Sequence, residues 1–232
     1  EDVDLELDYI YCNIAKNKRV IPLSDTTKVY LEKYIKEQVE KLLIEIVCII
    51  VLSNFLCMFC FLFLNLAFQG NMEELASILS LVISFVIMPF YVLKKQHNIK
   101  ISEIGIAKIG ITDSIFLISA VIFSVFLFIT KGNLKIFTEV VSQQLFVSIS
   151  EEILMRGIIF YLLSQLFRKK YYVVIVSAII FGFALHTGGD FLSNLVYRFP
   201  AGIILAVLRI YTKKLYPPMV VHFMYNLWCI YL

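Results

Sequence analysis

The chain has 232 residues, of which 60% are hydrophobic and 17% charged, and its mean hydropathy is +0.84. This apolar fraction is well above that of ordinary soluble domains, so the composition excludes a soluble enzyme or binding module. The net charge of +3 is small and scattered along the chain, which gives no indication of a nucleic-acid partner. We therefore expect an integral, multi-pass membrane protein that contacts the lipid bilayer.

The first 40 residues are polar and mix charged side chains with tyrosine and leucine. Surface or linker roles are the usual ones for such a segment. We predict a cytoplasmic N-terminal segment over residues 1–40, in which residues 27–41 are a candidate amphipathic helix that leads into the first span. Residues 41–232 are predicted to form the membrane domain.

Seven apolar runs in the rest of the chain have the length or hydrophobicity expected of membrane spans. They cover residues 42–68, 75–93, 114–130, 140–167, 171–186, 192–212 and 217–232. Pro89 and Pro200 lie inside two of these runs, where neighbouring helices can tolerate them. Residues 99–112 place isoleucine at many alternate positions and are predicted to form an interfacial connector. The predicted fold class is all-α: a polytopic transmembrane helical bundle of about seven spans.

The distribution of lysine and arginine agrees with this topology, because cytoplasmic flanks are enriched in both. Sixteen of the 21 lie in the N-terminal segment and in the connections that would face the same side, and only Lys131 and Lys135 lie on the opposite side. The remaining three, Arg156, Arg198 and Arg209, fall within spans. This pattern predicts a cytoplasmic N-terminus.

A charged cluster interrupts the fourth run at Glu151, Glu152 and Arg156. An ionisable group at bilayer depth costs at least ~2.5 kcal/mol, so such a group indicates a functional site. Glu152 and Arg156 are four residues apart, which favours an ion pair on one helix face and leaves Glu151 outside that pair. Gln144 and Ser148 extend a polar stripe that is expected to face the protein interior. A buried network that only locks helices together would explain the pair but not Glu151.

Two of the three histidines lie in the apolar bundle, His186 at the end of the fifth run and His222 in the seventh. His222 and Asn226 are four residues apart and would share one helical face. Either histidine alone is typical of an interior hydrogen-bonding residue, but together with two acids they favour catalysis. A buried carboxylate can act as a general base on water, and a histidine and an asparagine can stabilise an oxyanion. No Gly-x-Ser-x-Gly sequence is present, so the pattern favours hydrolysis without a side-chain nucleophile.

The ordered set Glu-Glu-x-x-x-Arg, a phenylalanine-rich segment ending in His186, and His-x-x-x-Asn resembles the CPBP family of intramembrane proteases. That family includes the type II CAAX prenyl endopeptidases of the Rce1 type and bacterial proteins linked to bacteriocin processing and self-immunity. The resemblance covers about residues 40–232. It implies a helical membrane bundle with a polar cavity between its helices.

The resemblance also implies roles for single residues. Glu151 corresponds to the carboxylate that activates water and His186 to the histidine that shares this water, while Glu152 and Arg156 correspond to the supporting pair. His222 and Asn226 correspond to the oxyanion stabilisers. The family has been described both as glutamate-dependent and as metal-dependent. No cofactor is indicated by the sequence itself, and if a zinc ion is used, its ligands would be Glu151, His186 and His222.

The second motif departs from the family pattern. Phenylalanine usually stands four residues before the histidine, but here Gly182 takes that place and Phe181 and Phe183 flank it. Either the phenylalanine is shifted by one position or a local bulge brings one of the two into its place. The expected depths of the two histidines in the membrane also differ. Simple span counting places His186 near the outer end of its helix and His222 nearer the inner end of its own.

The sequence therefore predicts an intramembrane endopeptidase, in a bacterial cell membrane, that cleaves a peptide or a membrane-protein segment. The substrate could be a prenylated CAAX protein, a signalling peptide or a bacteriocin precursor. The main alternative is a non-catalytic membrane scaffold or bacteriocin self-immunity protein of the same fold. A proton-coupled transporter would be expected to show inverted repeats, and none is evident.

Overall fold

The computed structural model describes residues 2–4, 9–14, 17–22, 24–131 and 134–231. By its internal contacts the chain divides into two units, Glu1–Val47 and Cys48–Leu232, and the long helix α1 (Asp25–Ala67) passes from one to the other. The boundary falls inside the apolar half of α1.

The N-terminal unit contains a small antiparallel sheet followed by the first half of α1. Strands β1 (Asp2–Asp4), β2 (Tyr9–Ile14) and β3 (Asn17–Pro22) lie in chain order, and Tyr11 of β2 is paired with Val20 of β3. The helix then begins two residues before the predicted amphipathic segment and continues without a break through the first predicted span. The sheet was not predicted, because its strands are only three to six residues long and lie in a segment whose charged residues were interpreted as a surface or linker region.

The C-terminal unit is built from helices and connecting loops, with no strand in its described part. After α1 its elements are α2 (Glu73–Leu81), η1 (Val82–Ile87), α3 (Met88–His97), α4 (Ile111–Lys131), α5 (Leu134–Glu152), η2 (Ile153–Ile159), α6 (Phe160–Leu166), α7 (Lys170–Ile179), η3 (Ile180–Leu185), α8 (Phe191–Ser193), η4 (Asn194–Arg198), α9 (Phe199–Thr212) and α10 (Tyr216–Tyr231). The η elements are π-helical turns that continue the α-helices around them. Each of the seven predicted spans therefore coincides with one helical rod, and the predicted all-helical bundle is confirmed.

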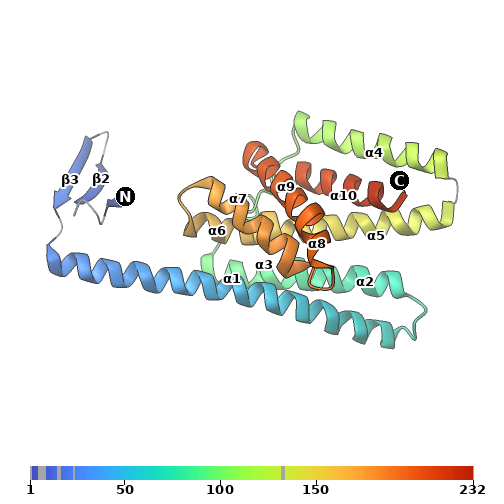
Figure 1. Ribbon diagram of the computed structural model, residues 1–232, viewed down its shortest axis with the longest axis horizontal. Helices are drawn as coiled ribbons and strands as arrows, with labels where there is room; N and C mark the ends of the chain where they lie inside the picture. Colours follow the sequence, from blue (N-terminus) through green and yellow to red (C-terminus); the bar gives the residue numbers. More distant parts are fainter. Residues whose placement is uncertain (1, 5–8, 15–16, 23, 132–133, 232) are drawn as a thin grey trace. The chain divides into compact units, whose positions relative to one another are not determined.

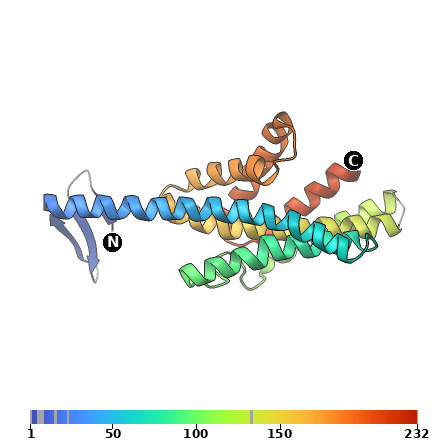
Figure 2. The same cartoon turned by 90° about the horizontal axis from the view of Figure 1, so that it is seen from below.

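The rod made of α5, η2 and α6 is central to this unit. Figure 2 shows it between the rod of α2, η1 and α3 on one side and α7 on the other, and both neighbours contact it. In Figure 1, α10 lies between α4 and α5, and α9 packs against α7. The two glutamates predicted for the site therefore sit on the most enclosed rod of the bundle.

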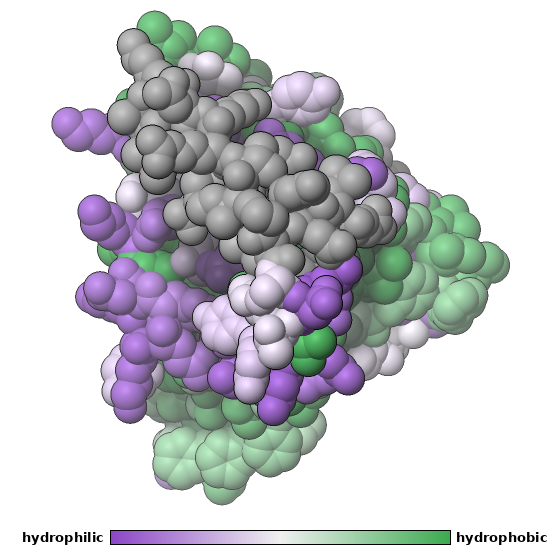
Figure 3. All heavy atoms as spheres, turned by 90° about the vertical axis from the view of Figure 1, so that its left-hand side faces the viewer, coloured by the Kyte–Doolittle hydropathy of each residue, from purple (hydrophilic) through white to green (hydrophobic). Residues whose placement is uncertain are grey.

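The surface of the helices is largely apolar, as lipid contact requires. Four rods are long and apolar enough to cross a membrane: Asp25–Ala67, Glu73–His97, Ile111–Thr130 and Phe191–Thr212. Large hydrophobic side chains such as Phe63, Ile122 and Ile204 are exposed on them. Figure 3, an end-on view, shows separate hydrophilic and hydrophobic areas on the surface. The chain is therefore a membrane protein.

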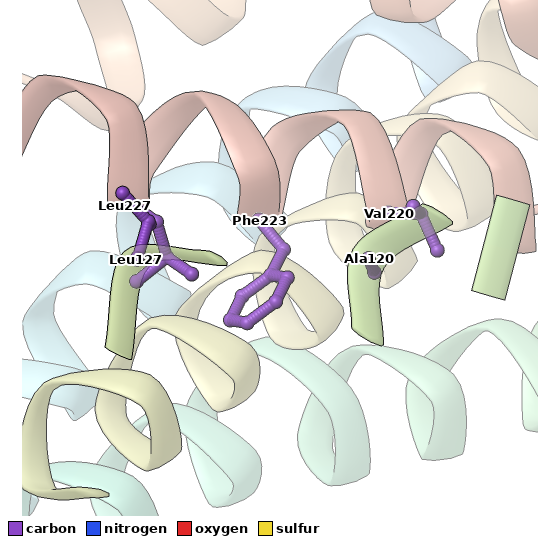
Figure 4. Packing of buried hydrophobic residues seen from close by; sticks show 5 residues of the cluster. All are labelled: Ala120, Leu127, Val220, Phe223 and Leu227. Atoms are coloured by element: carbon purple, nitrogen blue, oxygen red, sulfur yellow. The ribbon is translucent and has the colours of Figure 1, made fainter. Parts of the chain in front are cut away.

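A compact hydrophobic cluster joins α4 to α10. Figure 4 shows Ala120 and Leu127 of α4 beside Val220, Phe223 and Leu227 of α10. An apolar pocket of about 750 Å³ lies next to this cluster, between α4, α5 and α10. The cluster fixes α10, and with it the histidine at position 222, against its neighbours.

The predicted interfacial connector between α3 and α4 is folded into the bundle in part. Ile99 and Ile104 are buried, and the carbonyl oxygen of Gly105 accepts a hydrogen bond from the backbone N–H of Leu215 at 3.0 Å. A Cβ atom on Gly157 of η2 would come within 3.5 Å of Ile104. The connector thus packs directly against the π-helical turn that follows the two glutamates.

Candidate active site

The acidic pair lies where α5 passes into the π-helical turn η2. Glu151 is 8% exposed, and Glu152 and Arg156 have no exposed surface. The predicted ion pair is present: Nη1 of Arg156 donates to Oε1 of Glu152 at 3.0 Å. Ser148, one turn earlier, is also buried, so the predicted polar stripe faces the interior.

Glu152 connects this rod to α10. Its Oε1 atom also accepts a hydrogen bond from Nδ1 of His222 at 2.9 Å. One carboxylate oxygen thus receives bonds from a guanidinium and an imidazole that come from different helices. Removing a partner from such a buried charged cluster leaves an uncompensated charge, which is costly. Glu152 therefore holds α5 and α10 in register at the site.

Arg156 is fixed on three sides. Its Nη2 donates to the backbone carbonyl of Gly202 on α9 at 3.0 Å, and its guanidinium lies 4.3 Å from the centre of the Phe181 ring. A glycine is needed on α9 because a Cβ at position 202 would come within 3.1 Å of the backbone of Ala178. This close approach lets the Gly202 carbonyl reach the arginine.

The π-helical turn η3 accounts for the irregular spacing of the second motif. Nδ1 of His186 bonds to the carbonyl oxygen of Phe181, five residues earlier, at 2.9 Å. A π-turn contains one more residue than an α-turn, so Phe181 occupies the place that Phe-x-x-x-His would give to its phenylalanine. Its ring meets His186 and His222 edge-on, at centroid distances of 5.0 and 5.6 Å. Phe183 instead packs against Phe191.

Glu151 faces both histidines. Its Oε2 atom lies 3.8 Å from Nε2 of His186 and 3.8 Å from Nε2 of His222. Among the described residues this oxygen is buried and has no hydrogen-bond partner. Distances of 3.8 Å are too long for direct hydrogen bonds but suit groups bridged by a single water molecule. The difference in depth expected from span counting is therefore not observed.

The hydrogen bonds to Nδ1 determine how the two rings can act. A carbonyl oxygen only accepts, so Nδ1 of His186 carries the hydrogen that it donates to Phe181. His222 likewise donates Nδ1–H to the carboxylate of Glu152. The Nε2 atoms facing Glu151 accept a hydrogen bond when the ring is neutral and donate one when it is protonated.

Asn226 follows one turn after His222 on α10 and is half-buried. Its side chain has no hydrogen-bond partner in the described part of the chain.

Sequence reasoning missed the residues that hold His186 from behind. The buried Asn194 of η4 donates from Nδ2 to the carbonyl oxygen of His186 at 3.2 Å and accepts a hydrogen bond from Arg198. Asp190 caps the short helix α8 by accepting from the backbone N–H groups of Leu192 and Ser193, each at 3.0 Å. The four-residue spacing of Asn194 and Arg198, two polar residues within an apolar run, could have indicated this interaction from the sequence.

The donor set for a zinc ion is present but is not spaced as a metal site. In both histidines Nδ1 is anchored and Nε2 is free, as is usual for metal ligands. Ligands of a tetrahedral zinc ion at about 2.0 Å lie roughly 3.3 Å apart, whereas Oε2 of Glu151 is 3.8 Å from each Nε2. Over the described ranges, no group of three His, Cys, Asp or Glu residues is placed to hold a metal ion.

The fold and the site together define a polytopic helical membrane protein with a buried polar site built from two carboxylates, two imidazoles and an arginine. Residues 133–228 match the family model described as type II CAAX prenyl endopeptidase Rce1-like. This segment is less than half of the chain, but it contains every residue of the predicted site. This match to an Rce1-like family model agrees with the resemblance predicted from the motifs. No curated protein and no solved structure matches the chain.

Proposed function

We propose that the protein is an intramembrane endopeptidase in which Glu151 activates water for attack on a peptide bond. The observation that carries this proposal is the buried, unpartnered Oε2 of Glu151 at 3.8 Å from Nε2 of two histidines. In the described part of the chain Oε2 of Glu152 and Nε of Arg156 are also buried without a hydrogen-bond partner, so what distinguishes Glu151 is that two imidazole nitrogens converge on its free oxygen. The match of residues 133–228 to a family model of CAAX prenyl endopeptidases supports the same class of reaction.

In the proposed mechanism one water molecule lies between Glu151 and His186. It donates one hydrogen to Oε2 of Glu151 and the other to Nε2 of neutral His186, which leaves an oxygen lone pair directed at the substrate carbonyl carbon. As the bond between water and carbon forms, Glu151 takes the proton and later delivers it to the leaving amine. The Nδ1–H bond from His186 to Phe181 holds the imidazole in the tautomer that accepts from water.

His222 and Asn226 are proposed to stabilise the tetrahedral oxyanion. Because Nδ1 of His222 is bonded to Glu152, its Nε2 can donate to the oxyanion only when the ring is protonated. In the proposed mechanism the protonated ring is one donor, and the Asn226 amide supplies the second. Each such donor typically contributes ~3 kcal/mol to transition-state stabilisation.

An apolar pocket offers the substrate a path to this site from the side of the bundle. It has a volume of about 260 Å³ and lies between η4, α9 and α10, and His222 is one of its lining residues. Its other walls include Tyr197, Ile204 and Tyr225, all exposed. This pocket suits an extended apolar peptide or a membrane-protein segment, so we propose such a segment as the substrate.

The test is a comparison of peptides released by cells that carry the wild-type chain or Glu151→Gln, with mass spectrometry of membrane and medium fractions. A prenylated CAAX peptide is added as a defined substrate in a parallel assay. We expect loss of specific cleavage products by about 100-fold or more, because the amide cannot accept a proton from water. The protein is quantified in the membrane so that loss of the chain is not mistaken for loss of catalysis.

Glu139→Gln is the matched control, since this exposed residue lies on the same helix and undergoes the same change. It should leave every product unchanged. Equal product patterns for the wild type and Glu151→Gln would reject the protease proposal. They would favour a non-catalytic scaffold or immunity protein of the same fold.

A further inference from the structure

A third pocket, distinct from the site around Glu151, lies among α6, α7, α9 and the connector before α4. It has a volume of about 340 Å³. Four of its lining side chains are cationic, Arg168, Lys170, Arg209 and Lys213. Glu103 is the single acidic side chain among the described residues that line it. A pocket with this charge excess is suited to an anion.

Arg209 is the preorganised element of the pocket. Its Nε donates to the carbonyl oxygen of Arg156 at 3.0 Å and its Nη2 lies 3.5 Å from the carbonyl oxygen of Glu103. In the described part of the chain its guanidinium has no carboxylate partner. Gly105, with φ of +96°, passes over it so closely that a Cβ would lie 2.6 Å from Cζ of Arg209. The charged group is thus fixed in place without being neutralised.

The acidic residue of the pocket is already engaged. Oε2 of Glu103 accepts the backbone N–H of Lys100 at 2.6 Å, within its own turn. Lys170 begins α7 and Lys213 ends α9 in a left-handed conformation, and both are exposed. The pocket therefore has two exposed ammonium groups around one fixed guanidinium. This arrangement matches the tetrahedral oxygens of a phosphate group.

The surroundings place the pocket at the level of lipid headgroups. Tyr171 and Tyr172 follow Lys170 and are about half exposed, and Tyr211, which precedes Lys213, is 82% exposed. Tyrosine and tryptophan mark the membrane–water interface, and basic pockets between helices at that level bind anionic headgroups. We propose that this pocket binds a phosphate group, carried either by an anionic phospholipid headgroup or by a free phosphate ion.

The pocket also contacts the back of the acidic site. In an α-helix the backbone N–H of Phe160 would bond to the carbonyl of Arg156, but here it bonds to the carbonyls of Met155 and Gly157. The π-turn thereby leaves the Arg156 carbonyl available for Nε of Arg209. The proposed phosphate would contact the guanidinium that holds this peptide group. The binding proposal stands independently of whether the site around Glu151 is catalytic.

The test measures binding to the purified full chain in neutral detergent. Dioleoylphosphatidylglycerol, dioleoylphosphatidylcholine and sodium phosphate are titrated separately at constant ionic strength, and adducts are counted by native mass spectrometry alongside thermal unfolding. The double variant Lys170→Gln/Lys213→Asn removes two charges and retains a residue that tolerates the left-handed conformation at position 213. We expect its affinity for the anionic lipid to fall about tenfold or more.

Lys94→Gln/Lys95→Gln, which removes two exposed charges from α3, is the matched control and should bind as the wild type does. Binding of phosphatidylglycerol alone that depends on Lys170 and Lys213 identifies a lipid headgroup as the source. Binding of inorganic phosphate with the same dependence identifies a free ion. Equal affinity of the wild type and the Lys170/Lys213 variant, or binding of neither ligand, would overturn the proposal.

Discussion

Glu152 and His222 are joined by a 2.9 Å hydrogen bond between Oε1 and Nδ1, across 70 positions of the sequence. This bond decides which nitrogen of His222 faces Glu151. Because the same oxygen also binds Arg156, Glu152 organises the site while Glu151 remains free to act on water. The two adjacent glutamates therefore have different expected phenotypes.

Glu152→Gln should reduce both stability and activity, whereas Glu151→Gln should reduce activity alone. Breaking a buried charged pair typically costs about 3–5 kcal/mol, and an amide at position 152 would leave Arg156 uncompensated. Thermal unfolding in detergent and the amount of chain in the membrane measure stability. A Glu152→Gln protein as stable as the wild type would contradict this division of roles.

Phe181→Leu should impair activity and lower stability, because the ring lies under Arg156 and meets both histidines edge-on. Loss of these ring contacts is expected to cost about 1–2 kcal/mol. Phe183→Leu is the control, since Phe183 is half-buried and packs against Phe191. Product yield and unfolding temperature are measured for both. A larger effect of the substitution at position 183 would show that Phe183, and not Phe181, is the phenylalanine of the motif.

Gly202→Ala should separate α9 from α7 and weaken the bond from Arg156 to the Gly202 carbonyl. The new Cβ would lie 3.1 Å from Cα of Ala178 and 3.2 Å from Cδ1 of Phe181, which is tighter than ordinary packing. Overpacking of this kind typically costs about 1–3 kcal/mol. Gly188→Ala, where the added methyl meets no atom within 4 Å, should have little effect on unfolding temperature.

Asp190→Ala should reduce activity several-fold without loss of the chain from the membrane. The hydroxyl of Ser193 and two backbone N–H groups bond to the carboxylate and hold the pKa of Asp190 below its usual value. The cap is therefore complete at neutral pH and is lost as the pH falls through that lowered pKa. Without it, η4 and Asn194 would support His186 less firmly. Asp190→Asn, which can still cap a helix, should recover most of the activity.

Activity should survive a chelator such as 1,10-phenanthroline if Glu151 acts on water directly. The measurement compares product formation before and after chelation, and again after zinc is added back. Loss of activity that zinc restores would mean that an ion lies among Glu151, His186 and His222 in the working enzyme. In that case the ion, rather than the carboxylate, would activate the water.

The seven helical rods and the acidic pair could be predicted because hydrophobic runs and four-residue spacing are local signals. The sequence indicated Glu151, Glu152, Arg156, His186 and His222, and the structure brings these five together. The number of membrane crossings, the cytoplasmic N-terminus and the oxyanion role of Asn226 stay predictions. Reporter fusions after Lys131 and after Lys214 would test the topology, since opposite sides are expected.

The contacts between distant segments could not be predicted from the sequence. Nothing local indicates that the Gly202 carbonyl meets Arg156, or that Asn194 holds His186, because both depend on how α9 and η4 pack against other rods. Of the π-helical turns, only the one before His186 was anticipated, as the local bulge that was one of two alternatives for the irregular motif. Their hydrophobic pattern differs from that of an α-helix by only one residue per turn, and span counting is insensitive to such a difference.

The π-turn before His186 has a practical consequence for recognising related chains. A pattern that requires phenylalanine four residues before the histidine would discard this protein, although Phe181 contacts His186 and His222 and receives the Nδ1–H bond of His186 at its carbonyl. A single inserted residue, accommodated by a π-turn, changes the spacing of phenylalanine and histidine in the sequence but keeps the contacts between them. Searches that allow either four or five residues at this step should recover members that a fixed motif overlooks.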